Sequence, residues 1–196
     1  MVARPLFVNF PGDEQAYGRD GQFMLGPGVM VTPVLEPSAT SVSGYFPGGN
    51  WYDFKSRSLF LARSECSGPG TMETLQTPLT EINVHVHGGS ILPLQDAGMT
   101  VDASRSTPFT LLVTTCPMGK GKGGLFYDDG EQISLDKLLE TSYSAQISLT
   151  GGSVSGTVLQ NTLSSDSDSL PPLSTIVVLG TPTTLATAVS KATLNG

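Results

Sequence analysis

The chain has 196 residues, of which 38% are hydrophobic and only 14% charged, and it contains 23 Gly and 14 Pro. This composition is typical of an all-β protein with many turns, and the length allows two small domains, each with its own core. Ten Lys and Arg against 17 Asp and Glu give a net charge of −7, which disfavours nucleic acid and anionic membrane surfaces as partners. No apolar run approaches the roughly 18 residues that a transmembrane helix needs.

Targeting and redox signals leave the compartment open. The first ten residues lack the basic start and long apolar core of a signal peptide. Cys66 and Cys116 could form at most one intramolecular disulfide, and their number does not decide whether they pair.

The first 28 residues predict one strand and one helical segment. Residues 6–10 favour a strand that Pro11 and Gly12 end. Residues 13–26 are the best helix candidate in the first half of the chain, although Gly18 and Gly21 make such a helix short or irregular.

Residues 29–94 have the pattern of a compact β-domain. Residues 47–50, Pro-Gly-Gly-Asn, predict the turn of a hairpin, and residues 55–75 show little periodicity and predict a surface excursion. Residues 82–87 alternate strictly, which places His85 and His87 on one face of a strand. The expected strands are residues 29–35, 41–46, 51–54, 82–87 and 90–94.

A second β-domain is expected after a boundary near Leu94, because short strands and turn residues continue at the spacing of a sandwich. The expected turns include residues 120–123 and 128–130. The expected strands are residues 109–115, 124–127, 143–149, 154–159 and 174–179.

Two candidate polar sites have simpler structural explanations. His85 and His87 could ligate zinc together, but no third ligand is identifiable, so a polar strand face packed in the fold is the favoured interpretation. Asp128 and Asp129 before Gly130 suggest a calcium loop or an acid/base pair, but the further ligands of an EF-hand are missing and a hairpin turn is favoured.

Two other candidates concern ligand binding. The run Lys120-Gly-Lys-Gly-Gly124 lacks the spacing of a phosphate-binding loop and predicts a flexible turn. An aromatic platform for sugar rings could form from four residues, although alternation predicts that at least two of them face the core. These residues are Tyr45, Phe46, Trp51 and Tyr52.

Six motifs in this order resemble the C-terminal end of the α-glucosidases of glycoside hydrolase family 31, most closely the lysosomal acid α-glucosidase and maltase branch. The resemblance covers nearly the whole chain and weakens after Asp136. The motifs are VARPLFVNFP (residues 2–11), QFMLG (22–26), MVTPVLEP (30–37), YFPGGNWYD (45–53), INVHVHGGSILPL (82–94) and LFYDDG (125–130).

The resemblance implies a layout and an activity. Residues 1–28 would be the last strand and helical segment of a catalytic (β/α)₈ barrel, with residues 2–10 as the strand. Residues 29–94 would be a proximal and residues 95–196 a distal antiparallel β-sandwich. Relatives are retaining enzymes that hydrolyse terminal α-linked glucose with two carboxylates about 5 Å apart.

Both carboxylates of the family precede the matched motifs, so no catalytic residue, cofactor site or metal site is carried over to this chain. The resemblance implies the upstream barrel as partner and an α-glucan or oligosaccharide as possible ligand, with a chain that is inactive alone. A stand-alone carbohydrate-binding or structural β-sandwich module is the alternative. His87 departs from the family, which usually has Arg before the Gly-Gly turn, so a salt bridge from that Arg is not carried over.

Overall fold

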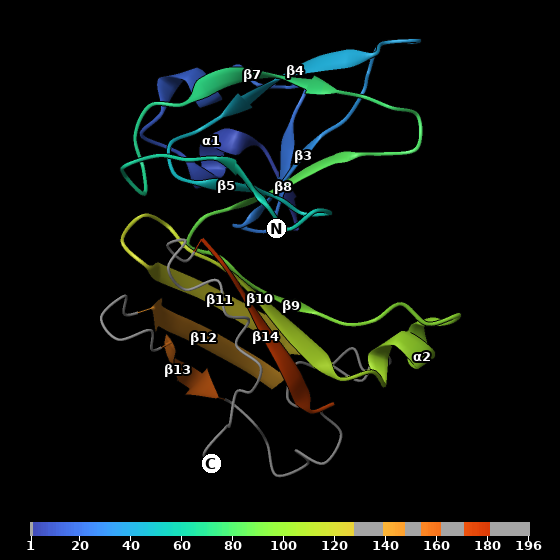
Figure 1. The fold of residues 1–196 in the computed structure, drawn as a ribbon, viewed down its shortest axis with the longest axis vertical. Coiled ribbons are helices and arrows are strands. Elements are labelled where there is room, and N and C mark those ends of the chain that lie inside the picture. The colour runs from blue at the N-terminus through green and yellow to red at the C-terminus, as the bar shows by residue number, and fades with distance from the viewer. Residues whose placement is uncertain (1, 128–138, 148–153, 162–170, 181–196) are drawn as a thin grey trace. The chain divides into compact units, whose positions relative to one another are not determined.

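The structure is a computed structural model that describes residues 2–127, 139–147, 154–161 and 171–180, and it is built almost entirely of antiparallel β-sheets (Figure 1). The described residues divide into two compact units. Unit 1 comprises Met1–Ser90 and Thr114–Met118, and unit 2 comprises Ile91–Val113 and Gly119–Gly196. The all-β fold class expected from the sequence is confirmed.

Unit 1 contains a six-stranded sheet and a two-stranded sheet. The two-stranded sheet pairs β4 (Ser41–Phe46) with β7 (Thr71–Gln76). The six-stranded sheet has the order β1 (Ala3–Arg4), β2 (Phe23–Leu25), β3 (Val29–Thr32), β8 (Asn83–His87), β5 (Trp51–Asp53) and β6 (Leu59–Leu61).

The core of unit 1 is formed by side chains from both sheets and from the N-terminal segment. Strands β2, β3 and β5 contribute Met24, Met30 and Trp51, and the two-stranded sheet contributes apolar side chains from the other side. The fully or almost fully buried members are Leu6, Ala16, Met24, Met30, Tyr45, Phe46, Trp51 and Leu75.

The described residues of unit 2 form two three-stranded sheets and one short helix, α2 (Val101–Arg105). One sheet has the order β14 (Leu173–Leu179), β10 (Phe109–Thr114) and β9 (Ile91–Leu94). The other has the order β11 (Lys120–Tyr127), β12 (Leu139–Ile147) and β13 (Val154–Asn161). All five strands expected in the second half are therefore present, although residues 148–149 of the third lie outside the described residues.

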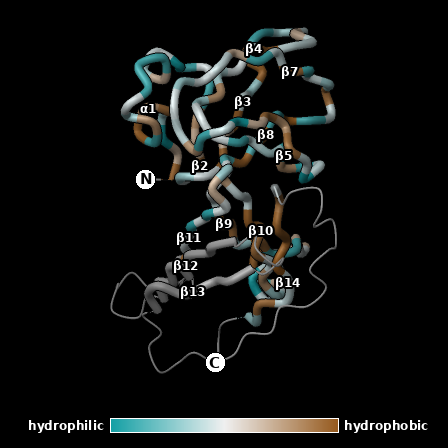
Figure 2. Tube along the Cα trace, turned by 60° about the vertical axis from the view of Figure 1, so that its left-hand side comes forward, coloured by the Kyte–Doolittle hydropathy of each residue, from teal (hydrophilic) through white to brown (hydrophobic). Residues whose placement is uncertain are grey.

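The core of unit 2 lies along β9, β10 and β14. Ile91, Leu111 and Val113 are buried, and three β14 side chains pack against them, namely Leu173, Ile176 and Val178. The trace is strongly hydrophobic along much of β10 and β14 (Figure 2). Alternate apolar residues on neighbouring strands thus share one face, as the period of two requires.

The N-terminal expectations are wrong at the level of elements. Of residues 2–10, only Ala3–Arg4 forms a strand, and it is followed by one helical turn, α1 (Leu6–Asn9), where residues 6–10 had favoured a strand. The side-chain amide of Asn9 donates to the carbonyls of Gly26 and Pro27 at 3.1 and 3.2 Å. Such tertiary contacts override a weak local strand preference.

The expected helix over residues 13–26 is also largely wrong. Residues 13–26 contain one 3₁₀ turn, η1 (Glu14–Ala16). The Asp13 carboxylate caps this turn by accepting a hydrogen bond from the backbone amide of Gln15. Phe23–Leu25 forms strand β2 instead, paired with β3 and β1. Gly18 and Gly21 interrupt any longer helix, as their propensity predicts.

Two expectations in the middle of the chain are wrong as well. Residues 47–50 do not close a hairpin, because β4 pairs with β7 while β5 pairs with β6 and β8. Residues 47–50 instead connect the two sheets of unit 1. Residues 55–75 are more than a surface excursion, since they include β6 and most of β7.

Candidate functional site

The four candidate platform aromatics lie inside unit 1 and not on its surface. Tyr45, Phe46 and Trp51 are completely buried, and Tyr52 is 1% exposed. The Trp51 indole nitrogen donates to the Pro47 carbonyl at 2.8 Å, and its ring packs edge-on against Phe46. A sugar-stacking platform made from these residues is therefore excluded.

His85 occupies an aromatic pocket beneath β8. Its ring lies 4.9 Å from Phe46 and 4.5 Å from Phe60, measured between ring centroids, and the side chain is 2% exposed. Burial lowers the pKa of His85 to about 4, while the negative charge of Asp53 opposes that shift. Within the described residues its Nδ1 has no hydrogen-bond partner. The ring is therefore held neutral as a packing group at neutral pH.

His87 packs at the connection between the two sheets. Its ring contacts Trp51 and Phe10 at centroid distances of 4.8 and 5.3 Å. Nε2 lies 2.9 Å from the Gly48 carbonyl oxygen, so it must carry the proton and donate, because a carbonyl only accepts. Burial lowers the pKa of His87, and the hydrogen bond to Gly48 acts in the opposite direction.

The two histidines do not form part of a larger ligand set. In the part of the chain that the structure describes, no group of three or more His, Cys, Asp or Glu side chains is placed to hold a metal ion. The side chains of His85 and His87 instead contact aromatic rings.

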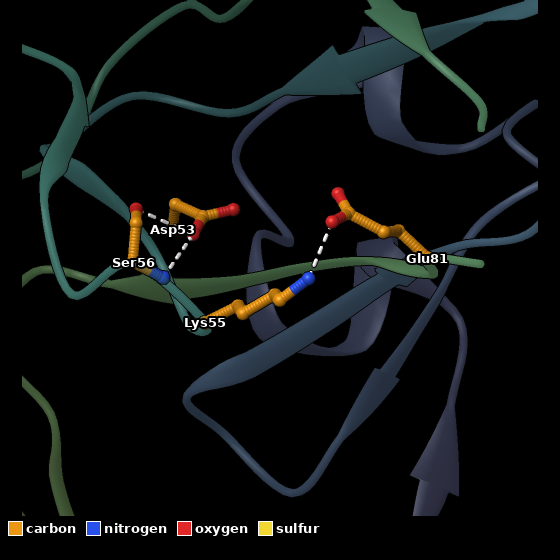
Figure 3. Close-up of polar contacts among 4 residues, drawn as sticks. All are labelled: Asp53, Lys55, Ser56 and Glu81. Carbon is orange, nitrogen blue, oxygen red and sulfur yellow. Dashed lines mark hydrogen bonds and ion pairs between the residues drawn. The ribbon is translucent and has the colours of Figure 1, made fainter.

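Polar contacts at the end of β5 stabilise a turn. The Ser56 amide and hydroxyl both donate to the Asp53 carboxylate at 2.6 Å, and Lys55 forms an ion pair with Glu81 (Figure 3). Burial acts to raise the pKa of Asp53, but the Ser56 hydrogen bonds and the attraction to His85 outweigh it, so this pKa is lowered. Lys55 is 72% exposed, so its ion pair contributes little to stability.

A disulfide joins the loop after β6 to the segment that follows β10. Cys66 and Cys116 are 50 residues apart in sequence, with Cα atoms 5.1 Å apart. Beside it, the Thr115 carbonyl accepts from the Tyr52 hydroxyl at 2.9 Å. These contacts fix the segment Thr114–Met118 within unit 1. The sequence had left open whether Cys66 and Cys116 pair.

A buried polar network holds the N-terminal segment to the two-stranded sheet. Gln22 accepts from the Tyr45 amide at 2.6 Å and donates to the Thr32 hydroxyl at 2.8 Å. The Tyr45 hydroxyl donates to Asp13 at 2.6 Å and accepts from the Gly70 amide at 2.9 Å. Burial, and then the hydrogen bond to Asp13, raise the pKa of Tyr45. The sequence did not predict this network. Its one local sign is Gln22, a polar residue between Gly21 and the apolar residues 23–25.

The remaining candidates fall in unit 2. The run from Lys120 to Gly124 was expected to be a turn, but it belongs to strand β11 and pairs with β12. A side chain at Gly123 would collide with the Ile91 carbonyl, so this glycine allows two strands to approach closely. Asp128 and Asp129 lie outside the described residues. Among the described helices, none is long and apolar enough to cross a membrane.

Comparison with known families gives a match for residues 1–92, which fit the description "Glycosyl hydrolase family 31 C-terminal domain". The chain is 44% identical over 155 residues to a probable α-glucosidase of Oryza sativa subsp. japonica, covering 79% of this chain and 17% of that protein. It is 41% identical over 148 residues to the lysosomal α-glucosidase of Mus musculus, covering 68% and 15%. The chain thus spans about a sixth of the length of these relatives.

Solved structures show the same fold. The glucosidase II alpha subunit superposes with a TM-score of 0.79 at 20% identity, over 95% of this chain and 20% of that one. A glycoside hydrolase family 31 dextranase of Flavobacterium johnsoniae superposes with a TM-score of 0.66 at 26% identity, over 75% of this chain and 18% of the dextranase. By its sequence and by its fold, the chain belongs to glycoside hydrolase family 31, where it corresponds to the C-terminal region of the family's α-glucosidases.

Proposed function

We propose that this chain is the non-catalytic C-terminal part of an α-glucosidase-like retaining glycoside hydrolase that releases terminal α-linked glucose. Its role is to support a catalytic (β/α)₈ barrel carried by the same polypeptide. The observation that carries the proposal is the match of residues 1–92 to a C-terminal domain, in relatives of which the chain covers only about a sixth.

The side chains of unit 1 support this role. Retaining glycoside hydrolysis needs a carboxylate nucleophile and a carboxylic acid about 5 Å apart, on either side of the scissile bond. The Asp13 and Asp53 carboxylates instead accept hydrogen bonds from Tyr45 and Ser56. His85 is 2% exposed, so a substrate could not reach it as an acid or base.

The test is an activity assay of the purified 196-residue chain on maltose and an aryl α-glucoside, with the α-glucosidase of Hordeum vulgare (barley), a relative of this chain, as positive control. We expect no turnover by this chain. Turnover at the rates of ordinary enzymes, roughly 1 to 10³ s⁻¹, that is abolished by a single substitution in this chain would refute the proposal.

A chimera tests the supporting role directly. The matched C-terminal region of the barley enzyme is replaced by this chain and compared with the barley enzyme truncated at the same point. We expect the chimera to hydrolyse maltose and the truncated enzyme to be inactive.

The division into domains is part of the same proposal. We propose that residues 1–28 derive from the barrel, residues 29–94 form the proximal sandwich and residues 95–196 the distal one. A stand-alone carbohydrate-binding module is less favoured, because the aromatic residues expected to form its platform are buried.

A further inference from the structure

A stacked pair of exposed aromatic rings lies at the N-terminal end of unit 1. The rings of Phe7 and Tyr17 are 5.5 Å apart between centroids and inclined by only 11°. Phe7 is 38% exposed, Val8 43% and Tyr17 57%. We call the surface formed by Phe7 and Tyr17 the Phe7–Tyr17 face. Large apolar side chains left this exposed in a cluster are characteristic of interaction surfaces.

The face is held rigidly by the residues beside it in sequence. Leu6, next to Phe7, and Ala16, next to Tyr17, are buried in the core of unit 1. The Tyr17 hydroxyl donates to the Pro11 carbonyl at 2.9 Å, which fixes the ring. The aromatic surface is therefore preorganised, and little conformational entropy would be lost on covering it.

We propose that the Phe7–Tyr17 face is the docking surface for an apolar patch on the part of the polypeptide that precedes this region, an inference that rests on the proposed function. The matched region is 17% of the rice relative and is described as a C-terminal domain, so most of such a protein precedes it. The face also lies three residues after β1 (Ala3–Arg4), so a preceding segment enters the fold close to it.

The same face is poorly suited to a sugar. The two rings face each other with centroids 5.5 Å apart, and the Tyr17 hydroxyl already donates its proton to Pro11. Phe7 has no polar side-chain atom. A sugar ring would find an apolar surface there but few groups for its hydroxyls, whereas an apolar protein patch needs none.

The experiment uses the barley chimera as one polypeptide. A photoreactive benzoylphenylalanine is placed at position 17, or at the fully exposed Leu79 of unit 1 as a control, and cross-linked peptides are identified by mass spectrometry. We expect position 17 to cross-link to barley residues upstream of the junction and position 79 to do so far less.

Serine variants give a second, independent readout. Buried aromatic anchors dominate interfaces, so we expect Phe7→Ser with Tyr17→Ser to inactivate the chimera roughly 30-fold faster on heating. The control Leu79→Ser should leave that rate unchanged. In the isolated chain, the same serine pair should shift the urea midpoint only slightly, because both rings are partly exposed there, which separates loss of docking from loss of folding.

The outcomes distinguish the two proposals. An inactive chimera counts against the proposed function, whereas the cross-links are read without activity. An active chimera in which position 17 forms no upstream cross-link, or in which the serine pair behaves like Leu79→Ser, overturns the docking surface alone. Suppression of cross-linking at position 17 by maltoheptaose would identify the face as a glucan site and would also overturn it.

Discussion

His85 is a titratable side chain enclosed by Phe46 and Phe60, and the low pKa of about 4 follows from that enclosure. An unfolded His has a pKa near 6.5. Between about pH 6.5 and pH 4 the unfolded chain therefore binds more protons at this position than the folded chain. The sign of the linkage makes the folded state lose stability as the pH falls through this window.

The residue-scale prediction is that His85→Phe removes part of the acid sensitivity. Between pH 7 and pH 4.5 the wild-type chain should lose about 2 kcal/mol of unfolding free energy through this group. The Phe variant keeps an aromatic ring in the pocket but cannot bind a proton. Urea unfolding at both pH values measures the difference, and equal losses in the two proteins would contradict the assignment.

Gly49 is a second position where the identity of one residue matters for the packing of unit 1. Its φ of +106° is strained for any other residue, and an added Cβ would collide with His87 Nε2 and lie 2.9 Å from the Cys66 carbonyl oxygen. We expect Gly49→Ala to destabilise unit 1 by about 2–4 kcal/mol. The matched control is Gly12→Ala, where a Cβ meets nothing within 4 Å, so its urea midpoint should hardly change. Equal effects of the two substitutions would contradict the assignment.

At the scale of elements, the disulfide connects parts of the chain that the strands alone do not join. Cys66 lies between β6 and β7, and Cys116 lies in the short Thr114–Met118 segment of unit 1. Closing a loop of 50 residues reduces the entropy of the unfolded chain. In the chain-entropy description such a link contributes about 4 kcal/mol.

The element-scale prediction is that Cys66→Ser with Cys116→Ser lowers the unfolding free energy by about 2–4 kcal/mol. Chemical denaturation with and without a dithiol reductant measures the effect. The reductant should destabilise the wild-type chain and leave the double variant unchanged. A wild-type midpoint that does not respond to reductant would show that the link does not constrain unfolding.

For the molecule as a whole, the N-terminal segment completes the core of unit 1. The sequence resemblance assigns residues 1–28 to the barrel, and this assignment predicts that Leu6, Val8 and Phe10 are exposed together in an isolated chain. That expectation is wrong for Leu6, which is completely buried, while Val8 is 43% exposed. Leu6, in the segment that the resemblance assigns to the barrel, thus contributes its side chain to the core of unit 1.

The corresponding prediction compares two substitutions in one helical turn. Leu6→Ala should cost about 2–5 kcal/mol because it leaves a cavity in a packed core. Val8→Ala should cost less than about 1 kcal/mol because Val8 is partly exposed. Urea denaturation followed by near-ultraviolet circular dichroism of the buried Trp51 reports both. If Leu6→Ala proved as mild as Val8→Ala, the N-terminal segment would not belong to the core.

Local signals were enough to predict the β-rich class, the family, the strands of the second half and five strands of the first ninety-four residues, namely β3, β4, β5, β8 and β9. Strand periodicity, turn residues and ordered motifs are all such local signals. Strand pairing and burial are not contained in those signals and follow only from the tertiary structure. Residues 47–50 have the composition of a hairpin turn, yet the flanking strands find partners in different sheets. Alternation placed His85 on a face, and only the packing of Phe46 and Phe60 made that face buried. Strand pairing, burial and the Cys66–Cys116 link all depend on residues distant in sequence, whose contacts no local pattern specifies.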